Sequence, residues 1–397
     1  MISDSNQHIN AYQSVLDQPR LEPKPHTPQA PKWRLTYQDG PRLQIDSLGT
    51  VKHMRVEFWD DTDLVYSADH LEAGNWYKPS RHWWCQWTVK IYCDGQLDSS
   101  ETVSLEGQPL TIEMGSASLG DTISFMGQLH TVIDTHKPSQ LLVKTHKPWL
   151  FDADKYSEQS IQFIPFTETQ IGNTMSVGVY YTMDQPWMRD EHKYDWRQQP
   201  LGKIAADRLG IEYKEIKPYM AQEYLQPSTQ LRPTRLPAKS IVIATQSTAQ
   251  AKYWNNPTGW QETIDWCNQN KIRVQHASKE GSELLGVEQL PEALTEVANA
   301  INDADVFVGI SSGLSWFAWA LGAKVVIISG FTDPYVEMET AHYINNHKVC
   351  HGCWGWDTFD KGDWNWCPAW KDTHRQFECT KQIESDVVIK KLKELII

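Results

Sequence analysis

The sequence predicts an α/β protein with two facing Rossmann-like domains, preceded by a small all-β domain and followed by a metal finger built on four cysteines. Three observations support this prediction. Strand-like and helix-like segments alternate over residues 110–226 and again over residues 240–340. Residues 32–109 contain short runs in which apolar and polar residues alternate. Four cysteines lie close together within residues 341–382.

Composition and charge exclude several classes of protein. With 397 residues the chain is long enough for two or three domains, and 40% hydrophobic residues supply an ample core. A formal net charge of -13 argues against a general nucleic-acid binder, which needs a basic surface. The sequence has no apolar run of membrane-spanning length, and residues 1–29 lack the apolar core of a signal peptide. We therefore expect a cytoplasmic protein that binds no nucleic acid and does not insert into a membrane.

The first two segments are an arm and a β-domain. Residues 1–31 are polar and carry several prolines, which is typical of a flexible or draping arm. In the next segment, the apolar residues between Trp83 and Val89 alternate with polar ones, the period of a half-buried strand. Several such runs separated by turns predict a small barrel or sandwich over residues 32–109.

The segment from residue 110 to residue 226 opens like a nucleotide-binding α/β unit. A buried strand leads into the small-residue loop 115–120, and an amphipathic helix is expected from Asp121 through Ile133. Strand, glycine-containing turn and helix in this order are typical of a Rossmann-like half.

A second unit of the same kind follows a linker. The linker, residues 227–239, contains prolines, and β/α alternation resumes over residues 240–340. After the cysteine segment, residues 383–397 are expected to form a C-terminal helix. Two such units place a cleft between the strand ends of each. This layout suits an enzyme that joins a nucleotide-bearing donor to a second substrate.

The loop Ser311-Ser312-Gly313-Leu314 lies between a buried strand and the start of a helix. Exposed backbone amides and the helix dipole at such a place form a site for a phosphate or diphosphate. Serines that only cap their own helix are the commoner alternative. The next strand also ends in a loop, residues 330–334, on the same edge of the sheet, which favours the ligand-binding interpretation.

Two charged residues follow the first strands of the second unit. Lys252 lies in the loop that begins at Thr245, where a lysine can neutralise a leaving diphosphate. Glu280 follows the next strand, where a carboxylate can accept hydrogen bonds from ribose hydroxyls. For each residue the alternative is a solvated surface charge without a ligand.

Asp121 is the carboxylate at the head of the first Rossmann-like helix, where we expect it to face the cleft. As a general base it would take the proton of an acceptor hydroxyl while that oxygen attacks a sugar. The alternative is a helix cap stabilised by the dipole. His130 is another candidate base, but it lies more than two turns further along the same helix.

The cysteine segment has the spacing of a metal site. Its first pair is a C-x2-C motif, which places two thiolates around one tight turn. Two later cysteines complete a sulfur-only shell that suits zinc or iron in a closed structural site. The four candidate ligands are Cys350, Cys353, Cys367 and Cys379. Disulfides are the alternative, although they are rare in the cytoplasm.

Several of these motifs together resemble those of the ADP-heptose glycosyltransferases. The matching segments are Gly120-Asp121-Thr122-Ile123, Lys252-Tyr253-Trp254, Val308-Gly-Ile-Ser-Ser-Gly-Leu314 and Gly330-Phe-Thr-Asp-Pro334. In that group the third segment usually reads Val-Asp-Thr-Gly-Leu-Ser-His-Leu-Ala. Here Ser311 and Ser312 replace the Asp-Thr pair and Trp316 replaces the histidine, so any role of those side chains is lost while the backbone cradle is expected to remain.

The β-domain and the cysteine finger extend the resemblance to the bacterial autotransporter heptosyltransferases of the TibC type. This resemblance implies a GT-B fold and inverting transfer of heptose from ADP-heptose to serine hydroxyls of an autotransporter adhesin. It also implies a homododecamer and one iron ion, expected as Fe3+ with Zn2+ as the alternative, held by the four cysteines.

The resemblance further implies roles for individual residues. Asp121 would be the general base and Lys252 the contact to the donor diphosphate. The nucleotide sugar would be bound by Gly120, Thr122, Thr245, Lys252, Glu280, Ser311, Ser312, Gly313 and Leu314.

Two other functions remain open at this point. One is an ADP-heptose-dependent lipopolysaccharide core heptosyltransferase, although the acidic charge balance argues weakly against work at an anionic membrane surface. The other is a non-catalytic, metal-stapled scaffold that binds carbohydrate through some of the 19 tryptophans.

Overall fold

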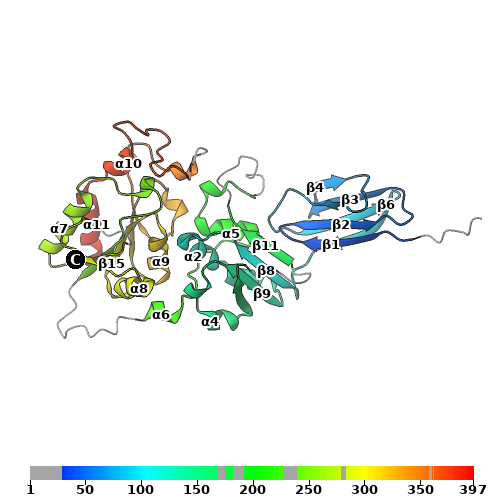
Figure 1. The fold of residues 1–397 in the computed structure, drawn as a ribbon, viewed down its shortest axis with the longest axis horizontal. Coiled ribbons are helices and arrows are strands. Elements are labelled where there is room, and N and C mark those ends of the chain that lie inside the picture. The colour runs from blue at the N-terminus through cyan, green and yellow to red at the C-terminus, as the bar shows by residue number, and fades with distance from the viewer. Residues whose placement is uncertain are drawn as a thin grey trace, which may run out of the picture.

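The computed structural model describes residues 29–167, 175–181, 192–226, 239–278, 283–356, 360 and 362–397. Most of the expected N-terminal arm and of the linker, and Glu280, lie outside these residues. The described elements form an elongated molecule with an all-β part at one end and two α/β parts beside it (Figure 1).

Two antiparallel sheets make up the all-β part. One has the order β1-β2-β5 and the other the order β4-β3-β6-β7. Their strands are β1 (Lys32–Tyr37), β2 (Pro41–Ser47), β3 (Met54–Asp60), β4 (Asp63–Ala68), β5 (Trp76–Tyr77), β6 (Trp87–Cys93) and β7 (Gln96–Thr102). Alternate side chains of β2 and β6 are buried, as the period-two pattern predicts. The strand expected from Trp83 begins only at Trp87, because Trp84 turns away and packs on Tyr37 and His136.

The first α/β part has a parallel sheet of order β10-β9-β8-β11. Its strands are β8 (Pro109–Met114), β9 (Gln140–Thr145), β10 (Ile161–Pro165) and β11 (Met175–Val179). Its helices are α2 (Leu119–Met126), α3 (Leu129–His136), α4 (Ala153–Ser157), α5 (Leu201–Leu209) and α6 (Gln222–Leu225), with 3-10 turns η1 (Pro148–Leu150) and η3 (Trp196–Gln198).

The helix expected from Asp121 through Ile133 is in fact two helices. The break falls at Gly127, where the chain passes so close to the backbone of Ile216 that a Cβ would lie 2.0 Å from its carbonyl oxygen. Only glycine permits this approach, and the amphipathic period continues across the break.

The second α/β part has a parallel sheet of order β14-β13-β12-β15-β16-β17. Its strands are β12 (Ser240–Ile243), β13 (Arg273–His276), β14 (Glu288–Gln289), β15 (Val306–Ile310), β16 (Val325–Ile328) and β17 (His342–Ile344). The central strands β12, β15 and β16 are buried along their whole length, as expected for parallel strands covered on both faces.

The remaining elements cover this sheet and carry the cysteine segment. The helices are α7 (Gly259–Gln269), α8 (Leu294–Asp303), α9 (Gly313–Ala320), α10 (Glu378–Lys381) and α11 (Ser385–Ile396), with 3-10 turns η4 (Gln250–Lys252), η5 (Pro334–Val336) and η6 (Cys353–Gly355). The C-terminal helix α11 packs on α7, and the cysteine segment lies above the second sheet, orange to red in Figure 1.

The two α/β parts touch through helices α2 and α9. A Cβ on Gly313 would lie 2.8 Å from the Cβ of Leu119, and a Cβ on Gly120 would lie 3.0 Å from a Trp316 ring atom. The two glycines therefore let the first turns of the two helices approach closely.

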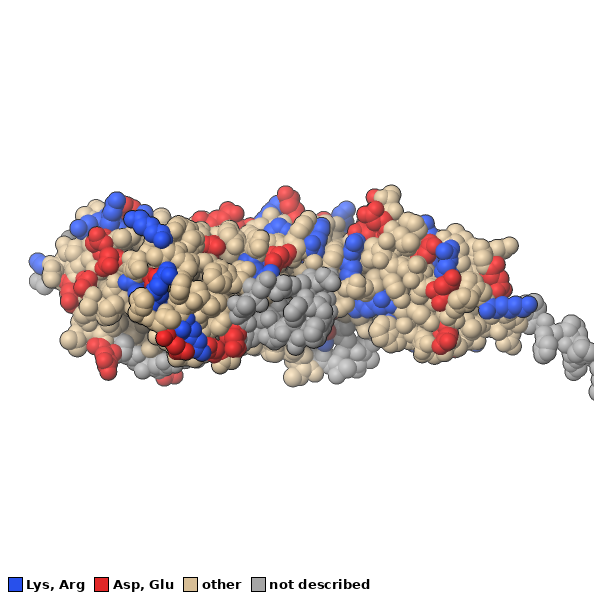
Figure 2. All heavy atoms as spheres, turned by 90° about the horizontal axis from the view of Figure 1, so that it is seen from above, with Lys and Arg blue, Asp and Glu red and all other residues tan. Residues whose placement is uncertain are grey.

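The surface carries charges of both signs. On the face seen in Figure 2, Lys and Arg side chains lie among Asp and Glu side chains and form no continuous basic area. None of the helices in the described part of the chain combines the length and the apolar character that crossing a bilayer requires.

A buried arginine joins the all-β part to the first α/β part. Arg208 of α5 is 1% exposed and donates hydrogen bonds to Asp39 (3.0 Å) and to the carbonyl of Gly178 on β11 (2.7 Å). Asp39 in turn accepts from the backbone N–H of Gly178. One guanidinium thus links the β1–β2 turn, strand β11 and helix α5.

Replacing this arginine should loosen the junction. We expect Arg208→Ala to lower the free energy of unfolding by about 3 kcal/mol, the order found when one partner of a buried ion pair is removed. Arg34→Ala, which breaks the exposed Arg34–Asp46 pair, should cost much less, because water screens that pair. Urea denaturation of both variants measures the difference, and equal costs would contradict the role of Arg208.

Candidate functional site

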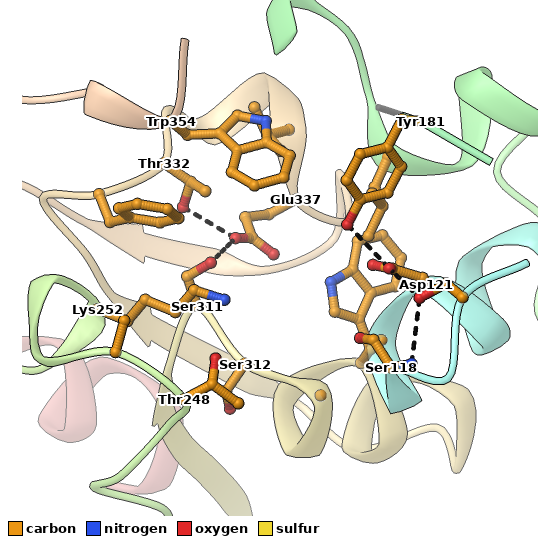
Figure 3. A pocket seen from close by; sticks show the side chains of 18 of the residues that line it. Ser118, Asp121, Tyr181, Thr248, Lys252, Ser311, Ser312, Thr332, Glu337 and Trp354 are labelled. Carbon is orange, nitrogen blue, oxygen red and sulfur yellow. Dashed lines mark hydrogen bonds between the residues drawn. The ribbon is translucent and has the colours of Figure 1, made fainter. Parts of the chain in front are cut away.

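A pocket of about 590 Å³ lies between the two α/β parts (Figure 3). Its walls come from the loop before α2, the loop after β12, the start of α9, the loop after β16 and the cysteine segment. The first part contributes Ser116, Ser118, Gly120, Asp121, Tyr180 and Tyr181, and the second contributes Thr248, Lys252, Ser311, Ser312, Gly313 and Glu337.

Asp121 is held in this pocket by two hydroxyl donors. It is 6% exposed, and its Oδ2 accepts hydrogen bonds from Ser116 Oγ (2.6 Å) and Tyr181 Oη (2.8 Å). It lies in the first turn of α2, but its side chain makes no capping hydrogen bond. Asp121 is therefore not simply a helix cap. Burial, together with the neighbouring Asp121 carboxylate, raises the pKa of Tyr181 well above its usual value, which keeps the hydroxyl as a donor.

Lys252 enters the pocket from the turn η4 of the second part. Its ammonium lies 5.4 Å from the centre of the Phe331 ring. Burial lowers the pKa of Lys252, while the carboxylates of Asp121 and Glu337 act in the opposite direction. A buried cation of this kind is stabilised further by any anion that enters the pocket.

Glu337 is a buried carboxylate opposite Asp121. It is 3% exposed, and its Oε1 accepts hydrogen bonds from Ser311 Oγ (2.5 Å) and Thr332 Oγ1 (2.9 Å). Its other oxygen, Oε2, has no hydrogen-bond partner among the described residues. Burial raises the pKa of Glu337, and the two hydroxyl donors and Lys252 limit that rise.

The start of helix α9 faces the same pocket. Ser312 occupies the N-cap position, yet its side chain makes no capping bond, and its Oγ is buried without a partner among the described residues. The hydroxyl of Ser311 donates its hydrogen bond to Glu337 and not to a backbone group of its own helix. The alternative in which these serines only cap α9 therefore does not hold, and the first turn of α9 is open to a ligand.

Several residues expected in the donor site lie outside the pocket lining. Thr122 donates to the carbonyl of Ser118 (2.7 Å), and Thr245 is hydrogen-bonded to His276 (3.0 Å). Leu314 is half-buried in α9 but does not line the pocket. The alternative base His130 bonds to Gln159 (2.8 Å) and is also absent from the lining. Glu280 falls outside the described residues.

The cysteine segment forms part of the pocket wall, a role that was not predicted from the sequence. Its contributing side chains are Trp354, Asp360, Asp363 and Trp366. Trp354 packs edge-on against Tyr181 of the first part, with ring centres 5.8 Å apart. The abundance of tryptophan and aspartate between the cysteines was the available signal for this role.

The four cysteines themselves line a second, small cavity of about 20 Å³. Burial and the neighbouring cysteines raise the pKa of Cys379 to about 12 and that of Cys353 well above its usual value. A set of four sulfur donors fits a soft or borderline metal ion such as iron or zinc.

Two parallel-sheet α/β parts enclose a pocket that contains a carboxylate, a lysine and an open helix N-terminus, an arrangement that suits a two-domain glycosyltransferase. Comparison with known proteins agrees. The model of glycosyltransferase family 9 (heptosyltransferase) matches residues 189–353. The autotransporter heptosyltransferase BAHTCr of Citrobacter rodentium is 32% identical over 352 residues, which cover 83% of this chain and 81% of the relative. TibC of Escherichia coli O78:H11 is 31% identical over 355 residues, 83% and 82% of the two chains.

The chain belongs to the autotransporter heptosyltransferases and is a glycosyltransferase. A solved structure, the dodecameric iron-containing heptosyltransferase TibC in complex with ADP-D-beta-D-heptose, matches with a TM-score of 0.79 and 27% identity. That match covers 94% of this chain and 99% of the other. The predicted α/β glycosyltransferase fold is thereby confirmed.

Glu337 should reduce stability at neutral pH. Because its pKa is raised in the folded state, the ionised form costs free energy above the pKa of about 4.3 of an unfolded glutamate. We expect Glu337→Gln, which keeps an acceptor for Ser311 and Thr332, to raise the free energy of unfolding at pH 7. The gain should shrink as the pH falls toward 4.

The measurement is urea denaturation of the two proteins from pH 4 to pH 8. The exposed Glu106→Gln serves as the control for the substitution itself and should change the free energy of unfolding at pH 7 by no more than about 0.5 kcal/mol. If Glu337→Gln were less stable than the wild type at pH 7, the ionised carboxylate would stabilise the fold, and the prediction would be wrong.

Proposed function

We propose that this protein transfers heptose from ADP-heptose to serine hydroxyls of an autotransporter adhesin, with inversion at the anomeric carbon, in the cytoplasm. The observation that carries the proposal is the state of Asp121. Both of its hydrogen-bond donors bind Oδ2, so Oδ1 has no partner among the described residues and is free to accept a proton. A carboxylate oriented in this way suits a general base.

The second α/β part supplies groups that suit the leaving diphosphate. In the proposed reaction the serine oxygen forms a bond to the anomeric carbon while the bond from that carbon to the diphosphate oxygen breaks. Asp121 takes the serine proton, and ADP leaves with the electron pair. The charge that builds on the diphosphate is balanced by Lys252 and by the amides at the start of α9, around Ser312 and Gly313.

Glu337 is the further group that we assign to this site. The family's usual aspartate at the position of Ser311 is absent here, but Ser311 donates its hydroxyl to Glu337. A carboxylate is therefore present next to the loop even though the loop sequence has lost one. Its unpaired Oε2 is available to a hydroxyl of the bound donor sugar.

We propose one iron ion, with zinc as the alternative, as the occupant of the four-cysteine site. Support comes from the sulfur-only donor set and from the iron-containing TibC. Such an ion would hold the finger, and with it Trp354 and Trp366, against the pocket. We also propose a homododecamer, by analogy with dodecameric TibC.

The base assignment is tested with Asp121→Asn. We expect transfer of radiolabelled heptose to a serine-rich autotransporter passenger to fall by roughly 10²–10⁴, the usual contribution of a general base, with little change in the affinity for ADP-heptose. Asp134→Asn, an exposed aspartate on α3, is the control and should retain full turnover.

The acceptor is tested in the same assay. Transfer that persists in Asp121→Asn would refute the role of this residue. Wild-type label that appears on lipid A core and not on the passenger would instead support the lipopolysaccharide enzyme. Binding of ADP-heptose with transfer to neither acceptor would favour the non-catalytic scaffold.

The finger is tested with Cys353→Ser. We expect the metal content per chain, measured by elemental analysis, to fall. Turnover should drop at least about tenfold, because Trp354 next to this cysteine lines the pocket. Cys93→Ser, which lies on β6 of the all-β part, should change neither quantity. Undiminished metal in Cys353→Ser would remove the four-cysteine site from the proposal.

A further inference from the structure

A second group of potential metal ligands lies beside the cysteine site. Asp333, His347 and His351 each offer one donor atom, and these atoms all lie within 4.8 Å of one another. Asp333 lies in the loop after β16, His347 follows β17, and His351 lies inside the Cys350–Cys353 turn. None of the three lines the glycosyltransferase pocket.

The hydrogen bonds of His351 fix which of its nitrogens carries the lone pair. Its Nδ1 lies 2.9 Å from the carbonyl oxygen of Val349, and a carbonyl can only accept, so Nδ1 carries the proton of the neutral ring. Nε2 of a neutral His351 then presents a lone pair. This is the arrangement of metal-binding histidines, whose other nitrogen donates to a backbone carbonyl or a carboxylate.

This nitrogen points at the other two candidate ligands. His351 Nε2 accepts a hydrogen bond from His347 Nδ1 (2.8 Å) and lies 3.9 Å from Asp333 Oδ1, and a bound cation would replace the proton shared by the two histidines. The two imidazole rings meet edge to face, with centres 4.4 Å apart and planes at 86°. Two nitrogens from the loop between β17 and η6 and one carboxylate oxygen from the loop after β16 thus converge.

The backbone is shaped to bring these segments together. Gly352 has φ +67°, and a Cβ there would lie 2.3 Å from Asp333 Oδ2. Its N–H also donates to the carbonyl of Gly330 (2.9 Å). Any other residue at 352 would push Asp333 away from the turn that carries His351.

We propose that Asp333, His347 and His351 form a second metal site, separate from the four cysteines, that binds one Zn2+ or a similar borderline divalent cation. Two imidazoles and a carboxylate favour zinc over magnesium or calcium, which prefer oxygen ligands only. Three protein ligands leave a fourth position for water, and the partial exposure of the group gives an ion access from solvent.

Such an ion would connect the finger to the pocket loop. Asp333 directly follows Thr332, whose hydroxyl is bonded to Glu337 in the pocket. A cation shared by Asp333 and the two histidines would therefore tie the loop that positions Glu337 to the turn that carries the first two cysteines. The site is independent of the proposed heptose transfer and can be tested without it.

The test is a zinc titration of the full-length protein as purified, against a competing chromophoric chelator, after its initial metal content has been measured. We expect one further zinc ion per chain in the wild type. His347→Ala and Asp333→Asn should each weaken its binding by at least about 10–100-fold, the effect of losing even an outer partner of a metal ligand. His351 is left unchanged, because its replacement would disturb the adjacent cysteines.

Two controls make the result specific. His374→Ala removes an exposed histidine of the same finger and should bind zinc like the wild type. His70→Ala alters the other compact group, His53, Asp69 and His70 on the all-β part, and should also leave the further ion in place. Zinc retained in His347→Ala, zinc lost in His70→Ala instead, or a wild type that takes up no further ion would each overturn the proposal.

Discussion

The close contact of helices α2 and α9 is the constraint on which the site depends. Gly120 and Gly313 lie at that contact, and a Cβ on either would press on the opposite helix. Asp121 directly follows the first glycine, and Ser312 directly precedes the second. The same contact therefore places a carboxylate from one α/β part and an open helix N-terminus from the other at the two sides of one pocket.

The pocket concentrates charges that are costly to bury. Burial lowers the pKa of Lys252 and raises that of Glu337, so each charged form is less favourable here than in water. The lysine and the two carboxylates, Asp121 and Glu337, offset part of this cost for each other. An entering diphosphate would favour the charged form of the lysine and disfavour the charged forms of the carboxylates. These buried charges therefore suit the binding of an anion and do not maximise the free energy of unfolding.

Local sequence patterns predicted the parallel strands, the turn before Asp121 and the loop at Ser311, because these depend on nearest neighbours along the chain. Glu337 could not be predicted, since its role arises only when the loop after β16 folds back onto Ser311. The expected site residue Thr245 instead pairs with His276 on the adjacent strand, a contact between segments 31 positions apart. Long-range contacts of this kind have no periodic signature in the sequence.

A single loop joins the separate features of the second α/β part. Gly330 packs on Cys379, where a Cβ would lie 2.5 Å from the sulfur, so the loop rests directly on the cysteine set. Thr332 bonds to Glu337 inside the pocket, and Asp333 faces the histidines of the finger. Any ordering of the finger therefore reaches the pocket within a few residues, through packed atoms and hydrogen bonds. This short path gives a physical reason for the proposed metal in the finger of a glycosyltransferase whose chemistry needs no redox step.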